Sequence, residues 1–235
     1  MLILDSYPEC GFGNRLLYFI NLVQSAKKKD CGYFSTDFGG GDVLTYKLFE
    51  PDHKENEQYK PVLGDAFFEN NTVPVKSFVD VKDMIDLPPH TVAIHFRGRD
   101  FFEWNPEAVL SSEYYINAID EVWKDGAEHF ILFTDQELPA YLEVKKYLEE
   151  NKLPHTEGKN NPDRSMFMED FRTMASCDYI ISSPSTFCIT AGMLGTKKKI
   201  IHSKEWVEKQ ITNLDKFWVD LYNGGNEDYS IWRLI

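Results

Sequence analysis

The chain has 235 residues, a length that fits one large or two small domains. Because 43% of the residues are hydrophobic and 14% are aromatic, it can bury a core, which excludes wholesale disorder. The net charge of −13 argues against non-specific binding to nucleic acid or anionic membranes, so an anion site needs locally concentrated positive charge.

The cysteines show neither zinc-ligand spacing nor a disulfide framework: Cys10, Cys31, Cys177 and Cys188. The sequence has no signal-peptide pattern and no apolar run near 18 residues. We therefore expect reduced thiols in a cytoplasmic protein with no integral membrane segment.

The N-terminal part begins with a predicted strand over Met1–Asp5, a glycine-containing turn and an apolar-periodic helix that ends near Lys27–Lys29. Lysines at that end complement the helix dipole. Two segments are predicted loops, namely Gly39–Gly41 and Pro51–Lys60. Pro88-Pro89 is the expected domain boundary, because neither residue fits a central strand.

Beyond the prolines, strands and helices alternate. The predicted strands are Thr91–Phe96, His129–Thr134, Asp178–Ser182 and Lys198–His202, and the predicted helices are Ser111–Lys124, Pro139–Asn151, Ser165–Ala175 and Ser185–Leu194. This alternation predicts a parallel, doubly wound α/β sheet. The tail from Glu205 to Ile235 is rich in aromatic residues, and we expect it to form a helix that packs back on the molecule: Trp206, Phe217, Trp218, Leu221 and Trp232.

The strand predicted over Thr91–Phe96 leads directly into charged residues, His95-Phe-Arg97-Gly-Arg99-Asp100. In an open α/β sheet, ligands bind outside the carboxyl ends of the strands. Arginine is permanently charged and its planar fork matches phosphate oxygens, so this cluster favours a diphosphate site. A loop of surface charges is the alternative explanation.

The turn before the first helix, Glu9-Cys-Gly11-Phe-Gly13-Asn14-Arg15, lets the backbone approach a ligand and offers helix N-terminal amides to an anion. It lacks the third glycine of a dinucleotide fingerprint and the Lys-Ser/Thr of a P-loop. Taken alone, the segment fits a tight strand-to-helix turn better than a ligand site.

Two later segments offer polar groups. Asp135 follows a predicted strand and suits either a base or ribose hydroxyl, or the N-cap of the next helix. Asp170 lies in a predicted helix, and Ser185-Thr186-Phe187 opens another, where hydroxyls and amides would seat a phosphate or simply cap the helix.

Taken in chain order, these motifs resemble those of the fucosyltransferase superfamily, which includes the α-1,2-, α-1,6- and protein O-fucosyltransferases. The segment from His95 to Asp100 is similar to its H-x-R-x-x-D signature. A glycine-rich turn precedes it, and a Thr-Asp strand end, an acidic helix and a Ser-x-Phe turn follow. The resemblance extends from Gly11 to about Gly195.

This resemblance implies a GT-B-like fold with two Rossmann-like halves. The expected parts are a reduced acceptor-side half at 1–89, a nucleotide-sugar-binding, parallel-sheet half at 90–204 and a helical tail at 205–235. The chain lacks a recognisable Golgi stem, as do compact bacterial or viral members.

The resemblance also assigns roles. His95 and Asp170 would contact guanine, and Arg97 would grip the β-phosphate of the donor. Ser185 and Thr186 would supply phosphate-side hydroxyls. Arg99 occupies a position that varies in the family.

We find no Asp-x-Asp triad, so we expect an inverting transfer without metal or other cofactor, in which Arg97 and the amides of Ser185–Phe187 stabilise the departing GDP. The general base would be Glu9, with Asp100 or Glu103 as alternatives, although an adjacent arginine favours an ion-pair role for Asp100. The aromatic residues Phe101, Phe102 and Trp104 would stack on a sugar or pack in the core.

The leading prediction is therefore a fucosyltransferase that uses GDP-fucose and a glycan or other hydroxyl acceptor. The alternatives are a transferase for another nucleotide sugar, such as one of xylose or rhamnose, and a nucleotide- or sugar-binding module that has lost turnover.

Overall fold

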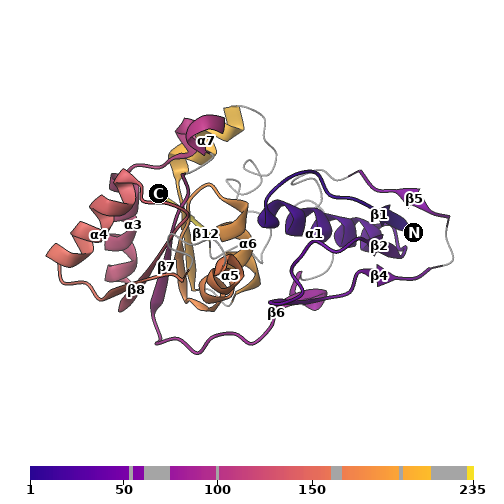
Figure 1. Cartoon of the computed structure of the whole chain (residues 1–235), viewed down its shortest axis with the longest axis horizontal. Coiled ribbons are helices and arrows are strands. Elements are labelled where there is room, and N and C mark those ends of the chain that lie inside the picture. The colour runs from indigo at the N-terminus through magenta and orange to yellow at the C-terminus, as the bar shows by residue number, and fades with distance from the viewer. Residues whose placement is uncertain (53–54, 61–74, 99–100, 160–165, 196–197, 213–231) are drawn as a thin grey trace.

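The computed structural model describes residues 1–52, 55–60, 75–98, 101–159, 166–195, 198–212 and 232–235, without the side chains of residues 104, 210–212 and 232 (Figure 1). Its elements form two main sheets that lie side by side along the long axis of the molecule. None of the helices in these ranges has the length and apolar character that crossing a bilayer requires.

The larger sheet has six parallel strands in the order β12-β11-β10-β7-β8-β9. Its strands are β7 (Thr91–Phe96), β8 (His129–Thr134), β9 (His155–Glu157), β10 (Tyr179–Ile181), β11 (Lys199–His202) and β12 (Trp232–Leu234). Every residue of β7 is buried, as expected for a central strand covered on both faces. The predicted parallel α/β sheet is thus confirmed.

Helices cover both faces of this sheet (Figure 1). They are α2 (Phe101–Trp104), α3 (Ser112–Lys124), α4 (Pro139–Glu150), α5 (Phe167–Ser176), α6 (Thr186–Leu194) and α7 (Lys204–Thr212), with the 3-10 helix η2 (Pro106–Ala108). Because side chains alternate along a strand, Val92, Ile94 and Phe96 pack under α3 and α4, whereas Ala93 faces α5 and α6.

The smaller sheet has the order β4-β2-β1-β5, in which β1 is parallel to β2 and β5 and β4 is antiparallel. The N-terminal elements are β1 (Leu2–Leu4), α1 (Phe12–Lys28), β2 (Tyr33–Ser35), β3 (Leu44–Tyr46), β4 (Phe49–Glu50), β5 (Glu57–Gln58), η1 (Val75–Ser77) and β6 (Val79–Val81). β3 and β6 form a separate antiparallel pair. One continuous hydrophobic cluster joins α1 and β1 to α5, α6 and one face of the larger sheet.

Two predictions about local structure need correction. The stretch Pro51–Lys60, predicted as a loop, contains β5, which is exposed and held by hydrogen bonds to β1. The tail is only partly helical, because α7 ends at Thr212 and Trp232 starts a strand that pairs with β11. Trp206 is buried as predicted, while Phe217, Trp218 and Leu221 lie outside the described residues.

Candidate active site

The carboxyl edge of the larger sheet brings together residues from neighbouring strands. β7 and β8 pair over six residues, ending with Phe96 opposite Thr134, so the next positions, Arg97 and Asp135, emerge side by side. Arg97 Nη1 lies 2.7 Å from Asp135 Oδ2 in a largely buried ion pair. The Arg97 guanidinium also lies 5.4 Å from the ring centroid of Phe101.

The structure excludes one of the two interpretations of Asp135. The N-cap of α4 is Leu138, which makes no side-chain capping bond, so the prediction of Asp135 as N-cap is wrong. The aspartate instead fixes an arginine at the strand end. Phe101 likewise packs on that arginine.

His95 is the last residue of β7 on the face that packs against α5 and α6. Its ring Nδ1 lies 2.7 Å from Ser183 Oγ, and its carbonyl accepts a bond from the Tyr115 hydroxyl. Burial, with a smaller contribution from the charge of Arg97, lowers the pKa of His95 to about 3. The imidazole is therefore neutral at physiological pH, with one nitrogen that donates and one that accepts.

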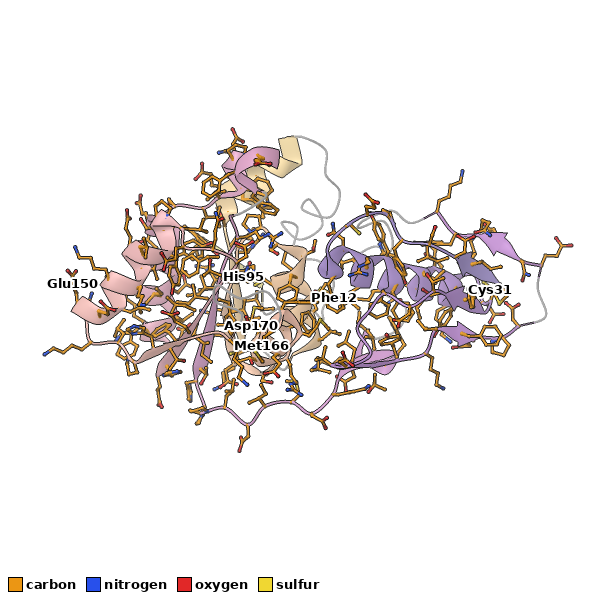
Figure 2. All side chains as sticks on the ribbon, viewed as in Figure 1. Phe12, Cys31, His95, Glu150, Met166 and Asp170 are labelled. Atoms are coloured by element: carbon orange, nitrogen blue, oxygen red, sulfur yellow. The ribbon has the colours of Figure 1, made fainter. Side chains whose placement is uncertain are left out.

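Asp170 lies on α5 and is buried against the end of β8. Its Oδ1 accepts a 2.8 Å bond from the backbone amide of Lys159. A Cβ placed on Gly158 would come within 2.4 Å of the Phe133 ring and 3.0 Å of Asp170 Oδ1, which shows how closely these groups pack. Phe133 pairs with His95 in the sheet, and Figure 2 shows His95 and Asp170, the two predicted guanine-contacting residues, in the same part of the molecule.

The segment that opens α6 follows β10 at the same edge. Ser185 is the N-cap, with extended backbone, and its side chain makes no capping bond. The Thr186 hydroxyl donates to Asn14 Oδ1 at 2.7 Å, which ties α6 to α1. The Phe187 ring lies 6.1 Å from His95, centroid to centroid.

The glycine turn meets α6 directly. A Cβ on Gly13 would lie 2.4 Å from the backbone nitrogen of Phe187, whereas one on Gly11 would meet nothing within 4 Å. Gly13 thus permits the close approach of two helices. Phe12 packs against Phe187 and Phe171, and Figure 2 shows Phe12, His95 and Asp170 in the middle of the molecule.

The remaining predicted residues lie farther out or outside the described ranges. Arg15 lies among Tyr7, Asp37 and Gly39 of the N-terminal region, where bonds from the Gly39 amide and the Tyr46 hydroxyl, with a contribution from Arg15, lower the pKa of Asp37. Glu9 is exposed in the loop before α1, and Glu103 is exposed on α2. Arg99 and Asp100 lie outside the described residues.

Sequence reasoning missed Ser183 and Phe12. Ser183 follows β10, and the rule that ligands gather at strand ends applies to it as it does to Arg97. Phe12 gave no signal, because its ring contacts depend on how α1 docks on α5 and α6. Within the described ranges, no group of three His, Cys, Asp or Glu side chains is arranged to share a metal ion.

Comparison with known families adds one finding. The family model described as glycosyl transferase family 11 matches residues 55–221, well over half of the chain, including the whole carboxyl edge described above. No curated protein matches the chain. The match confirms the predicted resemblance to the fucosyltransferase superfamily. Because this match covers well over half of the sequence, the chain belongs to glycosyl transferase family 11, the α-1,2-fucosyltransferase family.

Proposed function

We propose that this protein transfers fucose from GDP-fucose to a hydroxyl group of a glycan acceptor, with inversion at the anomeric carbon and without a metal ion. The observation that carries the proposal is the meeting of Arg97, His95 and the N-terminus of α6 at one sheet edge. Family membership supports a fucosyltransferase-type enzyme, and the donor sugar follows from it as the proposal.

In this proposal Arg97 holds the diphosphate of the donor. When the C1–O bond of the sugar breaks, the electron pair stays on the β-phosphate oxygen, and the guanidinium meets the new charge. The ion pair with Asp135 supports this role because it fixes the guanidinium before the donor arrives. The backbone amides at Ser185–Phe187 and the hydroxyls of Ser185 and Thr186 would add hydrogen bonds to the diphosphate.

His95 and Asp170 would recognise the base. A neutral imidazole and a carboxylate provide the hydrogen-bonding groups that a guanine edge requires, and both lie beside Phe133 at the end of β8. Asp135, Arg15 and the turn at Gly11–Asn14 would complete the donor site, and Arg99 would add charge.

The acceptor hydroxyl attacks C1 from the face opposite the leaving diphosphate, and its proton passes to a base. We assign this role to Glu9, because its exposed carboxylate precedes the helix that docks on α6. Asp100 is the second candidate.

The proposed architecture is GT-B-like. Residues 1–89 would form the acceptor-side half, residues 90–204 the donor-side half and residues 205–235 the tail. The two sheets, each with parallel strands and flanking helices, support this division. We also propose a cytoplasmic location, which the four free cysteines support.

A thermal-shift panel of GDP, UDP and ADP, each with and without EDTA, tests the donor site. We expect GDP alone to raise the melting temperature, equally in both conditions. A preference for UDP would favour another nucleotide sugar, and no response to any nucleotide would refute the donor site.

Turnover requires a second measurement. Radiolabelled GDP-fucose should release its sugar to water or to an acceptor glycan in the presence of EDTA. If GDP binds but no donor is ever consumed, the protein is a nucleotide-binding module.

Asp170→Asn should weaken the preference for GDP over ADP while leaving the fold unchanged.

A further inference from the structure

Two consecutive serines that follow β10 each bond to a histidine of a neighbouring strand. β10 lies between β7 and β11 in the sheet. The hydroxyl of Ser183 lies 2.7 Å from Nδ1 of His95 in β7, and the hydroxyl of Ser182 bonds to Nδ1 of His202 at the end of β11. Both serines and His202 have no exposed surface, whereas 7% of the surface of His95 is exposed. The same pair of groups therefore occurs twice, once at the proposed donor site and once away from it.

The hydroxyl of Ser183 carries one proton, which needs an acceptor. Because Ser183 is buried, that acceptor has to come from the protein. Among the described residues, Nδ1 of His95 is the hydrogen-bond partner of this hydroxyl. If the ring donated to the serine instead, the hydroxyl proton would be left without an acceptor in the core, which is costly. The serine therefore donates and the ring nitrogen accepts.

A donating serine decides which nitrogen of His95 carries the proton. Burial, with a smaller contribution from the charge of Arg97, lowers the pKa of His95 to about 3, so the ring is neutral and has a single N–H group. Since Nδ1 accepts, the proton lies on Nε2. Within the described part of the chain, Nε2 has no hydrogen-bond partner of its own. It is thus a donor that a ligand can use.

The direction of this donor matters for the choice of purine. Guanine presents the acceptor O6 at the position where adenine presents the donor N6. An N–H group at Nε2 can bond to O6, but it would meet another donor on adenine. Sites that hydrogen-bond one ligand discriminate strongly against an analogue that leaves their polar groups unpaired.

We propose that Ser183 is a positioning residue that holds His95 as the Nε2–H tautomer, and that this fixed donor selects 6-oxopurines over 6-aminopurines. The proposal rests on the proposed function, since it takes His95 to face the base of the donor. It adds a side chain that does not touch the nucleotide and acts through the imidazole.

Long-range proton–nitrogen NMR spectra of the full chain, with ¹⁵N-labelled histidine and no nucleotide, test the tautomer. His95→Gln identifies the signals of His95 by their loss. We expect Nε2 of His95 to be protonated, and Ser183→Ala to give a mixture of the two tautomers. Ser182→Ala is the matched control, because it removes the equivalent bond to His202, and it should leave the signals of His95 unchanged. A proton on Nδ1 in the unmodified chain would overturn the proposal.

Calorimetric titration tests the selection of the base. The probes are GDP, inosine diphosphate, ADP and the diphosphate of 2-aminopurine riboside, which lacks O6. Ser183→Ala should weaken binding of GDP and inosine diphosphate by the same factor, about two- to tenfold, because the ring loses the bond that fixes its proton and its orientation. ADP and the 2-aminopurine nucleotide should bind as they do to the unmodified chain.

A merely structural role of Ser183 would give a different pattern. Equal weakening of all four nucleotides by Ser183→Ala would overturn the proposal, as would the base-specific pattern in Ser182→Ala. The spectra of the free protein do not depend on any nucleotide. If GDP fails to bind while Nε2 of His95 is protonated, the proposed donor site fails and the tautomer assignment stands. If GDP binds while Nδ1 is protonated, the donor site stands and the role of Ser183 fails.

Discussion

The two sheets of this protein bring residues to their strand ends in different ways. In the larger sheet, β7 and β8 pair over six residues, so Arg97 and Asp135 emerge together and form an ion pair. In the smaller sheet, β1 and β2 pair over three residues, and the hydroxyl of Ser35, the last residue of β2, lies 2.5 Å from the Tyr7 hydroxyl. The larger sheet thus has a charged pair at these strand ends, whereas the smaller sheet has a pair of hydroxyl groups.

The smaller sheet contributes to the site through a helix. α1 docks on α6 through Gly13, Asn14 and Phe12, at the point where α6 begins. In the proposed function, the carboxyl edge of the larger sheet would hold the donor, and the N-terminal region would position it and supply the general base. The following experiments test this division.

The largest expected effect is on Arg97. Arg97→Ala should lower the rate of sugar transfer about 100- to 1,000-fold, because it removes one preorganised contact to the leaving diphosphate. The measurement is the turnover of GDP-fucose, with circular dichroism to check the fold. Near-normal turnover would remove Arg97 from the mechanism.

Two further variants separate the loss of Arg97 as a donor contact from the loss of its ion pair with Asp135. Arg97→Ala leaves the carboxylate of Asp135 buried without this arginine, so Arg97→Ala/Asp135→Asn should recover stability while staying inactive. Lys145→Ala breaks an ion pair with Glu157 that is 2.6 Å long and partly exposed, and it should leave turnover unchanged.

The next effect is on the docking of α1. Gly13→Ala should lower the free energy of unfolding by about 1–3 kcal/mol, because the added carbon would overlap the backbone of Thr186 and Phe187. In an unobstructed helix a Gly→Ala change raises the free energy of unfolding by about 1 kcal/mol. A decrease for Gly13→Ala would therefore indicate the overlap with α6. Urea unfolding measures this free energy. Gly11→Ala, with open space around the new carbon, should change stability by less than about 0.5 kcal/mol.

Stability should also fall in acid. Burial lowers the pKa of His202 to about 3, as it does for His95, whereas both titrate near 6.5 when unfolded. Below pH 6.5 the unfolded chain takes up protons that the folded chain does not, so each histidine costs about 1.4 kcal/mol per pH unit toward pH 3.

His202→Gln tests this pH dependence away from the proposed site, because His202 is buried beside Ser182 and plays no part in the mechanism. Urea unfolding at several values between pH 7 and pH 4 should give a slope shallower by one proton than that of the unmodified chain. An unchanged slope would contradict a neutral, buried His202.

The smallest effect concerns the bond between Thr186 and Asn14. A double-mutant cycle with Thr186→Val and Asn14→Ala should give a coupling energy of about 0.5–1.5 kcal/mol, the usual net value of such a bond. Additive losses would show that the two residues act independently.

The sequence determined the larger sheet well. The bounds of β7 and β8 agree with prediction residue for residue, because buried apolar runs that end in charged residues are unambiguous. The strands β2 to β6 were missed, since two or three residues show no periodicity and their pairing depends on partners. β9 and β12, at the two edges of the larger sheet, were missed for the same reason, β12 in a tail whose aromatic residues favoured a helix.

The sequence alone also predicted that Arg97 and Ser185 lie at one sheet edge, since both follow strands whose carboxyl ends meet there. Only the tertiary structure decided which groups touch. The pairing of Arg97 with Asp135 depends on the register of β7 and β8, and the role of Gly13 depends on how closely α1 approaches α6. Local pattern specifies elements, whereas register and helix docking are set by packing between distant segments.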